Sequence, residues 1–162
     1  MAKNQGEEVV ADELEEMGSE PRVYELGFHL DPELPTEEVK KAFQAIRTGL
    51  AAAGPVIAEV EPEKIQLAYT ISRQEVSGRR DFSSAYFGWV VYETTPTQHA
   101  DLIKAAAANK AIIRFVDLLT DKDAARHALE VHELMEKAPT PQMDPEEVLS
   151  SEVDAALESA TI

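Results

Sequence analysis

Aromatic residues are confined to the middle of this 162-residue chain, because every Phe, Tyr and Trp lies between Tyr24 and Phe115. A highly charged segment without aromatic side chains has too little apolar surface to build its own core. The formal net charge is −16, yet residues 22–120 hold thirteen acidic and eleven basic residues, so most of the excess acid lies in the two flanks. We therefore expect one domain over 22–120, a disordered acidic N-terminal extension over 1–21, and an acidic C-terminal extension over 121–162.

The composition excludes several classes of site. Cysteine is absent, which removes disulfide scaffolds, cysteine-based zinc sites and thiol catalysis. No apolar run approaches the roughly 18 residues of a membrane helix, so we expect a cytoplasmic protein with no membrane partner. His127 and His132 are five residues apart, whereas two metal ligands on one helix face are three or four apart. No catalytic motif stands out, and we expect no enzymatic activity, metal or cofactor.

Residues 22–55 predict a strand followed by a helix. Apolar side chains alternate between Val23 and Leu30, which is typical of a strand packed on one face. The buried face of this strand is expected to carry Tyr24, Leu26, Phe28 and Leu30. Thr36 is in position to cap the helix, whose apolar residues form one stripe from Val39 to Ala53. Gly54 is expected to end it in a left-handed conformation.

The second half of the domain predicts two strands, a helix and a final strand. The strand-like segments Val56–Glu61 and Ile65–Arg73 can form one long kinked strand, and Gln74–Asp81 is expected to be a hairpin loop. The remaining segments are a strand over 84–93, a helix that begins at the capping box Thr95–Gln98, and a strand over Ile112–Leu119.

The resulting order, βαββαβ, indicates the α+β fold class. We expect a ferredoxin-like sandwich: a four-stranded antiparallel sheet with two helices on one face, plus a helical C-terminal extension of one or two amphipathic helices. One of the pairs Phe87 with Trp89 or Tyr86 with Tyr92 must then lie on the uncovered face. A helix over about 121–137 is expected to dock on the domain's own sheet, with a basic neighbouring protein as the alternative. For a second amphipathic segment, Asp144–Ser159, the sequence favours neither of these two docking sites.

The segment Gln66–Ser72, with the text Gln-Leu-Ala-Tyr-Thr-Ile-Ser, resembles the signature of the bacterial small-subunit ribosomal protein six family. Arg22–Leu26 and Ile112–Leu119, with Arg114, resemble the opening and closing strands of that family. Two positions depart from the signature, with Glu63 in place of glycine and Ile65 in place of a basic residue.

The resemblance implies a structural constituent of the small ribosomal subunit, located on the cytoplasmic ribosome. It implies binding to small-subunit ribosomal RNA together with ribosomal protein eighteen, with no small-molecule substrate and no obligate homo-oligomer. Phosphate contact is expected from the arginines around the predicted loop. The alternative is a solvated hairpin tip, in which these arginines only keep the loop soluble. The candidate RNA-binding residues are Arg22, Lys64, Tyr69, Arg73, Arg79, Arg80 and Arg114.

Two of these candidates leave an open choice at the level of sequence. Arg114 is expected on the uncovered sheet face, where it can meet RNA or a partner protein, or pair with Glu25. Lys64 is adjacent to Ile65, but a shift of one residue in a strand places a side chain on the opposite face.

Other functions are compatible with a ferredoxin-like sandwich. One is a regulatory ligand-binding domain. Another is a small enzyme, such as an acylphosphatase or a dimeric α+β barrel oxygenase. The acylphosphatase reading needs an arginine in the turn Asp31–Pro35, which has none. The oxygenase reading would rest on His29 or His99 lining a cavity.

Overall fold

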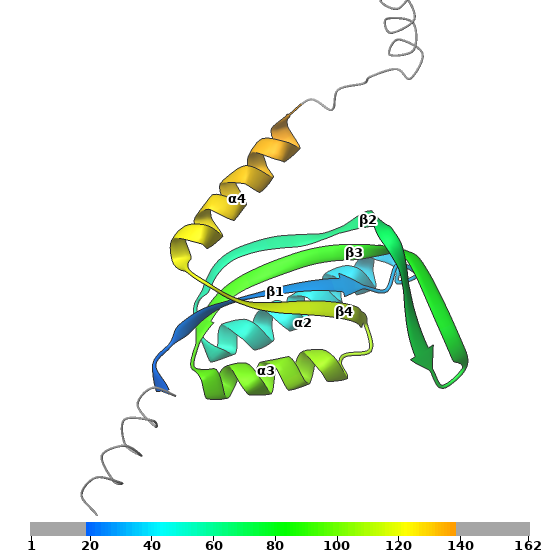
Figure 1. Cartoon of the computed structure of the whole chain (residues 1–162), viewed down its shortest axis with the longest axis horizontal. Helices are drawn as coiled ribbons and strands as arrows, with labels where there is room; N and C mark the ends of the chain where they lie inside the picture. The colour runs from blue at the N-terminus through cyan, green and yellow to red at the C-terminus, as the bar shows by residue number, and fades with distance from the viewer. Residues whose placement is uncertain (1–18, 139–162) are drawn as a thin grey trace, which may run out of the picture. The chain divides into compact units, whose positions relative to one another are not determined.

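The computed structural model describes residues 19–138. Its elements are β1 (Arg22–Leu30), α2 (Thr36–Ala53), β2 (Val56–Glu75), β3 (Gly78–Thr94), α3 (Pro96–Ala108), β4 (Ile112–Thr120) and α4 (Lys122–Lys137). The strands form one antiparallel sheet in the order β2-β3-β1-β4, with α2 and α3 on one face (Figure 1). The expected ferredoxin-like βαββαβ sandwich is thus confirmed. The predicted segment Asp144–Ser159 and most of the expected N-terminal extension lie outside the described residues.

The main core lies between the sheet and the two helices. The alternating residues of β1 predicted to face inward are buried, and Phe28 and Leu30 are completely inaccessible. They pack against the apolar stripe of α2, in which Val39, Phe43 and Leu50 are buried. The buried residues recur every second position in β1 and about every 3.6 positions in α2. These spacings are visible in the sequence, so both inward faces could be predicted from it.

The ends of α2 differ from the expectation. Pro35 precedes the helix and no side chain caps it, so Thr36 is its first residue and not its cap. Gly54 has a φ of 171° and is extended, so the expected left-handed conformation is wrong. Glycine is needed there for a different reason: a Cβ atom at Gly54 would lie 1.8 Å from the carbonyl oxygen of Glu93 on β3. In contrast, Thr95 caps α3 as predicted, accepting a hydrogen bond from the Gln98 amide at 3.4 Å.

The predicted hairpin loop Gln74–Asp81 is also wrong, because most of it is strand. Gln74 pairs with Arg79 and Glu75 with Gly78, which leaves a turn of only two residues. Gly78 has a φ of 123°, a conformation that glycine adopts without strain. The turn residues Val76 and Ser77 lack the usual Asn-Gly or Asp-Gly signal, so the tight hairpin was not apparent.

The two strand-like segments of the second half form a single strand, β2, as expected. The pairing of β2 with β3 shifts register between Val60 and Glu63 and again between Gln66 and Ile71. Register irregularities of this kind bend a strand pair. Figure 1 shows the distal part of the β2–β3 hairpin folding over at the end of the sheet.

The second sheet face is partly covered by the first half of α4. Trp89 and Val91 of β3 point to this face and form a buried cluster with Ala58 of β2 and Ala125 of α4. Lys122 of α4 also pairs with Glu93 of β3 at 2.5 Å. The expected docking of this helix on the domain's own sheet is therefore confirmed up to Glu130, where the first compact unit ends. The second unit begins at Val131, and its helical residues Leu134 and Met135 are exposed.

We expect Gly54→Ala to lower the free energy of unfolding by about 1–3 kcal/mol, because the added methyl group meets a backbone atom that cannot move freely. Gly49→Ala is the matched control, since a Cβ atom at this helical position meets nothing within 4 Å. It should raise stability by about 0.5–1 kcal/mol through helix propensity. Urea denaturation measures both variants, and equal effects would contradict the close approach at Gly54.

Candidate nucleic-acid interface

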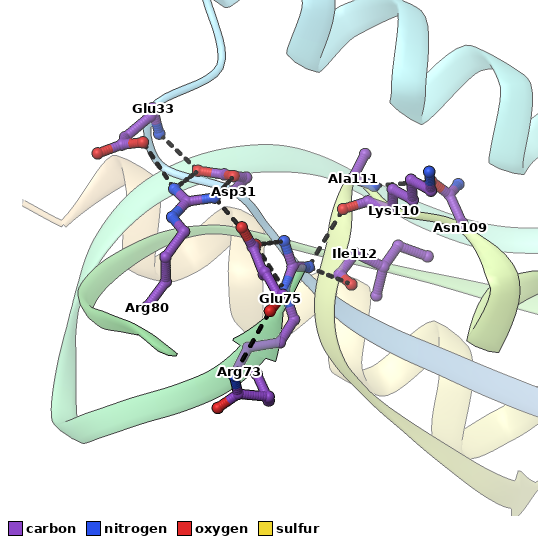
Figure 2. A network of polar contacts seen from close by, with 10 residues as sticks. Asp31, Glu33, Arg73, Glu75, Arg80, Asn109, Lys110, Ala111 and Ile112 are labelled. Atoms are coloured by element: carbon purple, nitrogen blue, oxygen red, sulfur yellow. Dashed lines mark hydrogen bonds and ion pairs between the residues drawn. The ribbon is translucent and has the colours of Figure 1, made fainter. Parts of the chain in front are cut away.

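An ion-pair network holds the distal hairpin against the end of the sheet (Figure 2). Arg80 of β3 reaches Asp31 at 2.9 Å and Glu33 at 2.6 Å, both in the turn after β1. The same guanidinium lies 3.1 Å from Glu75 of β2. One arginine therefore neutralises parts of three carboxylates and ties the hairpin to a turn 49 residues earlier in the chain.

Arg73 extends this network to the start of β4. Its guanidinium pairs with Glu75 and donates to the carbonyl oxygens of Lys110 at 3.1 Å and Ile112 at 3.3 Å. Arg73 and Arg80 both lie over the ring of Phe82, with guanidinium carbons 5.6 and 4.7 Å from its centroid. The two guanidinium groups thus cover the ring of Phe82, and each of them is paired with a carboxylate.

The network shifts the pKa values of its acids. Burial acts to raise the pKa of Asp31, but hydrogen bonds from Arg80 and the Glu33 amide, with the charges of Arg80 and Arg73, outweigh it and lower the pKa. The hydrogen bond from Arg73 is the main cause of a lowered pKa at Glu75. Both acids are therefore held in their charged forms, and the arginines have firm internal partners.

The arginines of the predicted cluster differ in position and exposure from what the sequence predicted. Arg73 and Arg80 do not lie on a flexible loop, and their side chains are only 25% and 28% exposed. Arg79 alternates to the outer side of the hairpin, is 67% exposed, and pairs with Asp81 at 2.9 Å. Phosphate contact by the three arginines stays a prediction, and for Arg73 and Arg80 a phosphate would have to compete with carboxylates already in place.

A second group of candidates lies on the sheet face opposite the helices. Phe87 of β3 is opposite His29 of β1, and His29 is opposite Arg114 of β4. The rings of Phe87 and His29 are 5.2 Å apart, and the Arg114 guanidinium lies 5.7 Å from the centroid of Tyr69 and donates to its hydroxyl. We call these four residues, Phe87, His29, Arg114 and Tyr69, the transverse row. Phe87, His29 and Arg114 lie at one level of the sheet, and Tyr69 of the distal part of β2 joins them through its contact with Arg114.

The transverse row carries one positive charge at neutral pH. Burial lowers the pKa of His29, and the neighbouring charge of Arg114 lowers it further, so the imidazole is uncharged. Arg114 does not pair with Glu25, which was one expected alternative. Within residues 19–138, no carboxylate forms an ion pair with Arg114, whereas Arg47, Arg73, Arg79, Arg80 and Arg126 each have an acidic partner.

Two lysines also lie without a carboxylate partner among the ion pairs of the described residues. Lys64 is opposite Tyr86 in register, 5.8 Å above its ring, and it borders a cavity of about 390 Å³ beside Arg80. Ile65 is opposite Ala85, so Lys64 and Ile65 point to opposite faces of the strand. Lys110, which the sequence did not single out, borders a cavity of about 730 Å³ between the hairpin tip and the end of α3. Arg22 lies exposed at the start of β1, opposite Thr94.

His99 serves the packing on the helix side of the sheet. Its Nε2 lies 2.8 Å from Asp117 and its Nδ1 lies 3.0 Å from the hydroxyl of Tyr92. A carboxylate only accepts, so in the neutral ring Nε2 donates to Asp117 and Tyr92 donates to Nδ1. Tyr24 stacks on the imidazole with the ring centroids 3.6 Å apart. The histidine thus connects α3 to three strands.

Residues 19–138 contain neither a cluster of metal-ligating side chains nor a membrane-spanning helix. No group of three or more His, Asp and Glu side chains in this part of the chain is arranged to hold a metal ion. None of its helices is long and apolar enough to cross a membrane.

Comparison with known proteins identifies a family and a similar fold. The family model described as Ribosomal protein S6 matches residues 23–118. Among solved structures, the 30S ribosomal protein S6 of Thermotoga maritima is similar, with a TM-score of 0.52 and 16% sequence identity over 74% of this chain and 100% of that chain. At this identity the structural likeness supports the fold alone. A search of curated protein sequences found no match.

We expect Asp31→Asn to lower the free energy of unfolding by about 1–2 kcal/mol at pH 7, because the charge-assisted hydrogen bond to Arg80 is weakened. The pKa of Asp31 is lowered in the folded protein, so its charge stabilises the fold above the ordinary pKa of 3.8. That contribution is lost as the pH falls through the folded pKa. Denaturation curves of variant and wild type should therefore converge below that pH.

Glu33→Gln is the control for this network, because the side chain of Glu33 is 79% exposed. An exposed ion pair contributes at most about 1 kcal/mol, so this variant should change stability less than Asp31→Asn. A gap between Asp31→Asn and wild type that persists at pH 2 would show that the charge of Asp31 is not the cause.

Proposed function

Since this chain belongs to the ribosomal protein S6 family, we propose that it binds small-subunit ribosomal RNA together with ribosomal protein eighteen. The family is a structural, non-enzymatic component of the small ribosomal subunit. The observation that carries the proposal is the family match over residues 23–118, which spans the sheet and both covering helices. The ion-paired hairpin and the open sheet face are the surfaces on which the RNA and protein contacts are proposed.

The RNA contacts are assigned first to cations that lack an acidic partner. Affinity for RNA comes largely from neutralised phosphates, and a cation already paired with a carboxylate gains less from a phosphate. Lys64, Lys110 and Arg114 meet this condition within the described residues. Arg22 and the exposed Arg79 are proposed to contribute at the periphery, while Arg73 and Arg80 hold the hairpin in shape.

Cell fractionation tests this assignment. We expect the full chain to sediment with the small ribosomal subunit and to be released by salt. The variant Lys64→Gln with Lys110→Gln should be released at lower salt, because each phosphate contact contributes roughly 0.7–0.9 to the slope of log K against log salt. The control is Lys40→Gln with Lys41→Gln, which removes two lysines from the outer face of α2.

The outcomes of this experiment separate two claims. Recovery of the wild-type chain only in the ribosome-free fraction would reject the proposed function. Equal release of both double variants would leave the ribosomal function in place and reject the two lysines as phosphate contacts.

The protein partner is assigned to the uncovered part of the open sheet face. Val116 and Leu118 of β4 are opposite Gly27 and Glu25, which alternate away from the core. Both are about half exposed, at 48% and 51%. Neighbouring apolar side chains on an exposed strand offer surface that a partner protein can bury. This part of the sheet therefore suits ribosomal protein eighteen better than it suits RNA.

We expect Leu118→Glu to weaken binding of purified ribosomal protein eighteen by roughly tenfold or more, since burying a leucine contributes about 1.5–3 kcal/mol. Leu119→Glu is the matched control: it is 65% exposed on the same strand, but it lies opposite Tyr24 and so on the helix side. Titration calorimetry measures both. Equal losses would show that charge alone, and not this face, governs the association.

A further inference from the structure

The transverse row is accessible to a ligand over much of its length. Tyr69 is 61% exposed and Arg114 is exposed, while His29 and Phe87 are partly exposed. Phe87 lies over the backbone of Gly27, where a Cβ atom would come within 3.7 Å of its ring. A small residue beneath the ring lets it lie close to the sheet. The row therefore presents flat groups in succession on one surface.

The chemistry of the row matches that of an unpaired nucleotide. Nucleotide bases stack on aromatic rings and on guanidinium planes, and four-stranded sheets of this general form use aromatic side chains on their surface for such stacking. Here the two central strands, β1 and β3, supply the adjacent rings of His29 and Phe87. Arg114 adds a planar cation with no acidic partner in the described part of the chain.

Opposite charges on the two sides of the His29 and Phe87 rings give the row a direction. Arg114 lies at the β4 end, and Glu63 of β2 is opposite Phe87 at the other end. Residues that are directly opposite in an antiparallel pair share a face, so Glu63 lies on the same sheet face as Phe87, next to it across the strands. A phosphate is favoured near Arg114 and repelled near Glu63. A carboxylate, on the other hand, accepts a hydrogen bond from the exocyclic amino group of a base.

We propose that the transverse row binds unpaired bases of single-stranded RNA, with the phosphate backbone at Arg114 and an amino-bearing base extending over Phe87 toward Glu63. The proposal rests on the proposed RNA-binding function and adds the class of nucleotide and its orientation. The row fits RNA better than protein because it pairs stacking groups with an uncompensated cation in a strongly acidic chain. The neighbouring apolar residues Val116 and Leu118 lack these features.

Fluorescence anisotropy of the full chain with labelled oligonucleotides tests the stacking. We expect oligo(C) of about ten nucleotides to bind, and an abasic strand with the same phosphates to bind much more weakly. Tyr69→Leu and Phe87→Leu should each weaken binding of oligo(C) by roughly five- to a hundredfold, the range expected for loss of one stacked base. Neither should change the salt dependence, because neither removes a charge.

The polar ends of the row are tested separately. Arg114→Gln should reduce the slope of log K against log salt by about 0.7, the value for one phosphate contact on a single strand. Oligo(C) should bind more tightly than oligo(U), since cytosine carries an amino group where uracil carries a carbonyl. Glu63→Gln should reduce this preference, whereas Glu37→Gln on α2 should leave it unchanged.

Several results would overturn the proposal while leaving the ribosomal function intact. One is equal binding of the abasic strand and oligo(C), which would mean that phosphates alone are bound. Another is unchanged RNA affinity in Tyr69→Leu with a lost affinity for ribosomal protein eighteen, which would make the row a protein interface. Thermal melts check folding, and the exposed position of Tyr69 keeps the test decisive even if Phe87→Leu is unstable. Failure of the chain to sediment with the small subunit, by contrast, would reject the proposed function itself.

Discussion

The ion pair between Arg80 and Asp31 determines how the distal hairpin is placed and leaves Arg80 paired with acidic side chains. It closes the distal hairpin onto the turn after β1, and Arg73 completes the closure by bonding to backbone carbonyls at the start of β4. Without these contacts a hairpin of this length would extend from the sheet with little apolar surface to hold it. In the same contacts, Arg73 and Arg80 are paired with carboxylates and no longer form a basic patch. An arginine at this site can either hold the hairpin against the sheet or remain unpaired for a ligand. Arg73 and Arg80 hold the hairpin.

The two faces of the sheet have different tasks. The face toward α2 and α3 packs apolar side chains and the hydrogen-bonded ring of His99 against the two helices. The other face is only partly covered, because the first half of α4 packs over Trp89 and Val91. What remains is the transverse row next to Val116 and Leu118. An amphipathic helix from the C-terminal extension thus determines which part of the sheet stays uncovered, and the proposed RNA and protein contacts both lie on that part.

The strongly acidic composition is compatible with RNA binding because charge acts locally. Within the domain, acidic and basic residues nearly balance, and most arginines are neutralised by near neighbours. A few cations, such as Arg114 and Lys64, have no acidic partner among the ion pairs of the described residues. A phosphate within a few ångströms is attracted to these groups, while charges farther away are screened by salt. The net charge of −16 therefore describes the flanks better than it describes the surface proposed to bind RNA.

The sequence by itself determined the order of the elements, the inward faces of β1 and α2, and the family, because periodicity and a short motif are local properties. The lengths of β2 and β3 were missed, since a Val-Ser turn carries no hairpin signal, and Gly54 was assigned the wrong role, since its neighbour on β3 is far away in the chain. The candidate arginines were identified by residue type, but only tertiary structure decided which are free. Arg80 finds Asp31 at a separation of 49 residues, and the transverse row assembles side chains from all four strands. Contacts of that kind depend on register and strand order, which no local pattern encodes.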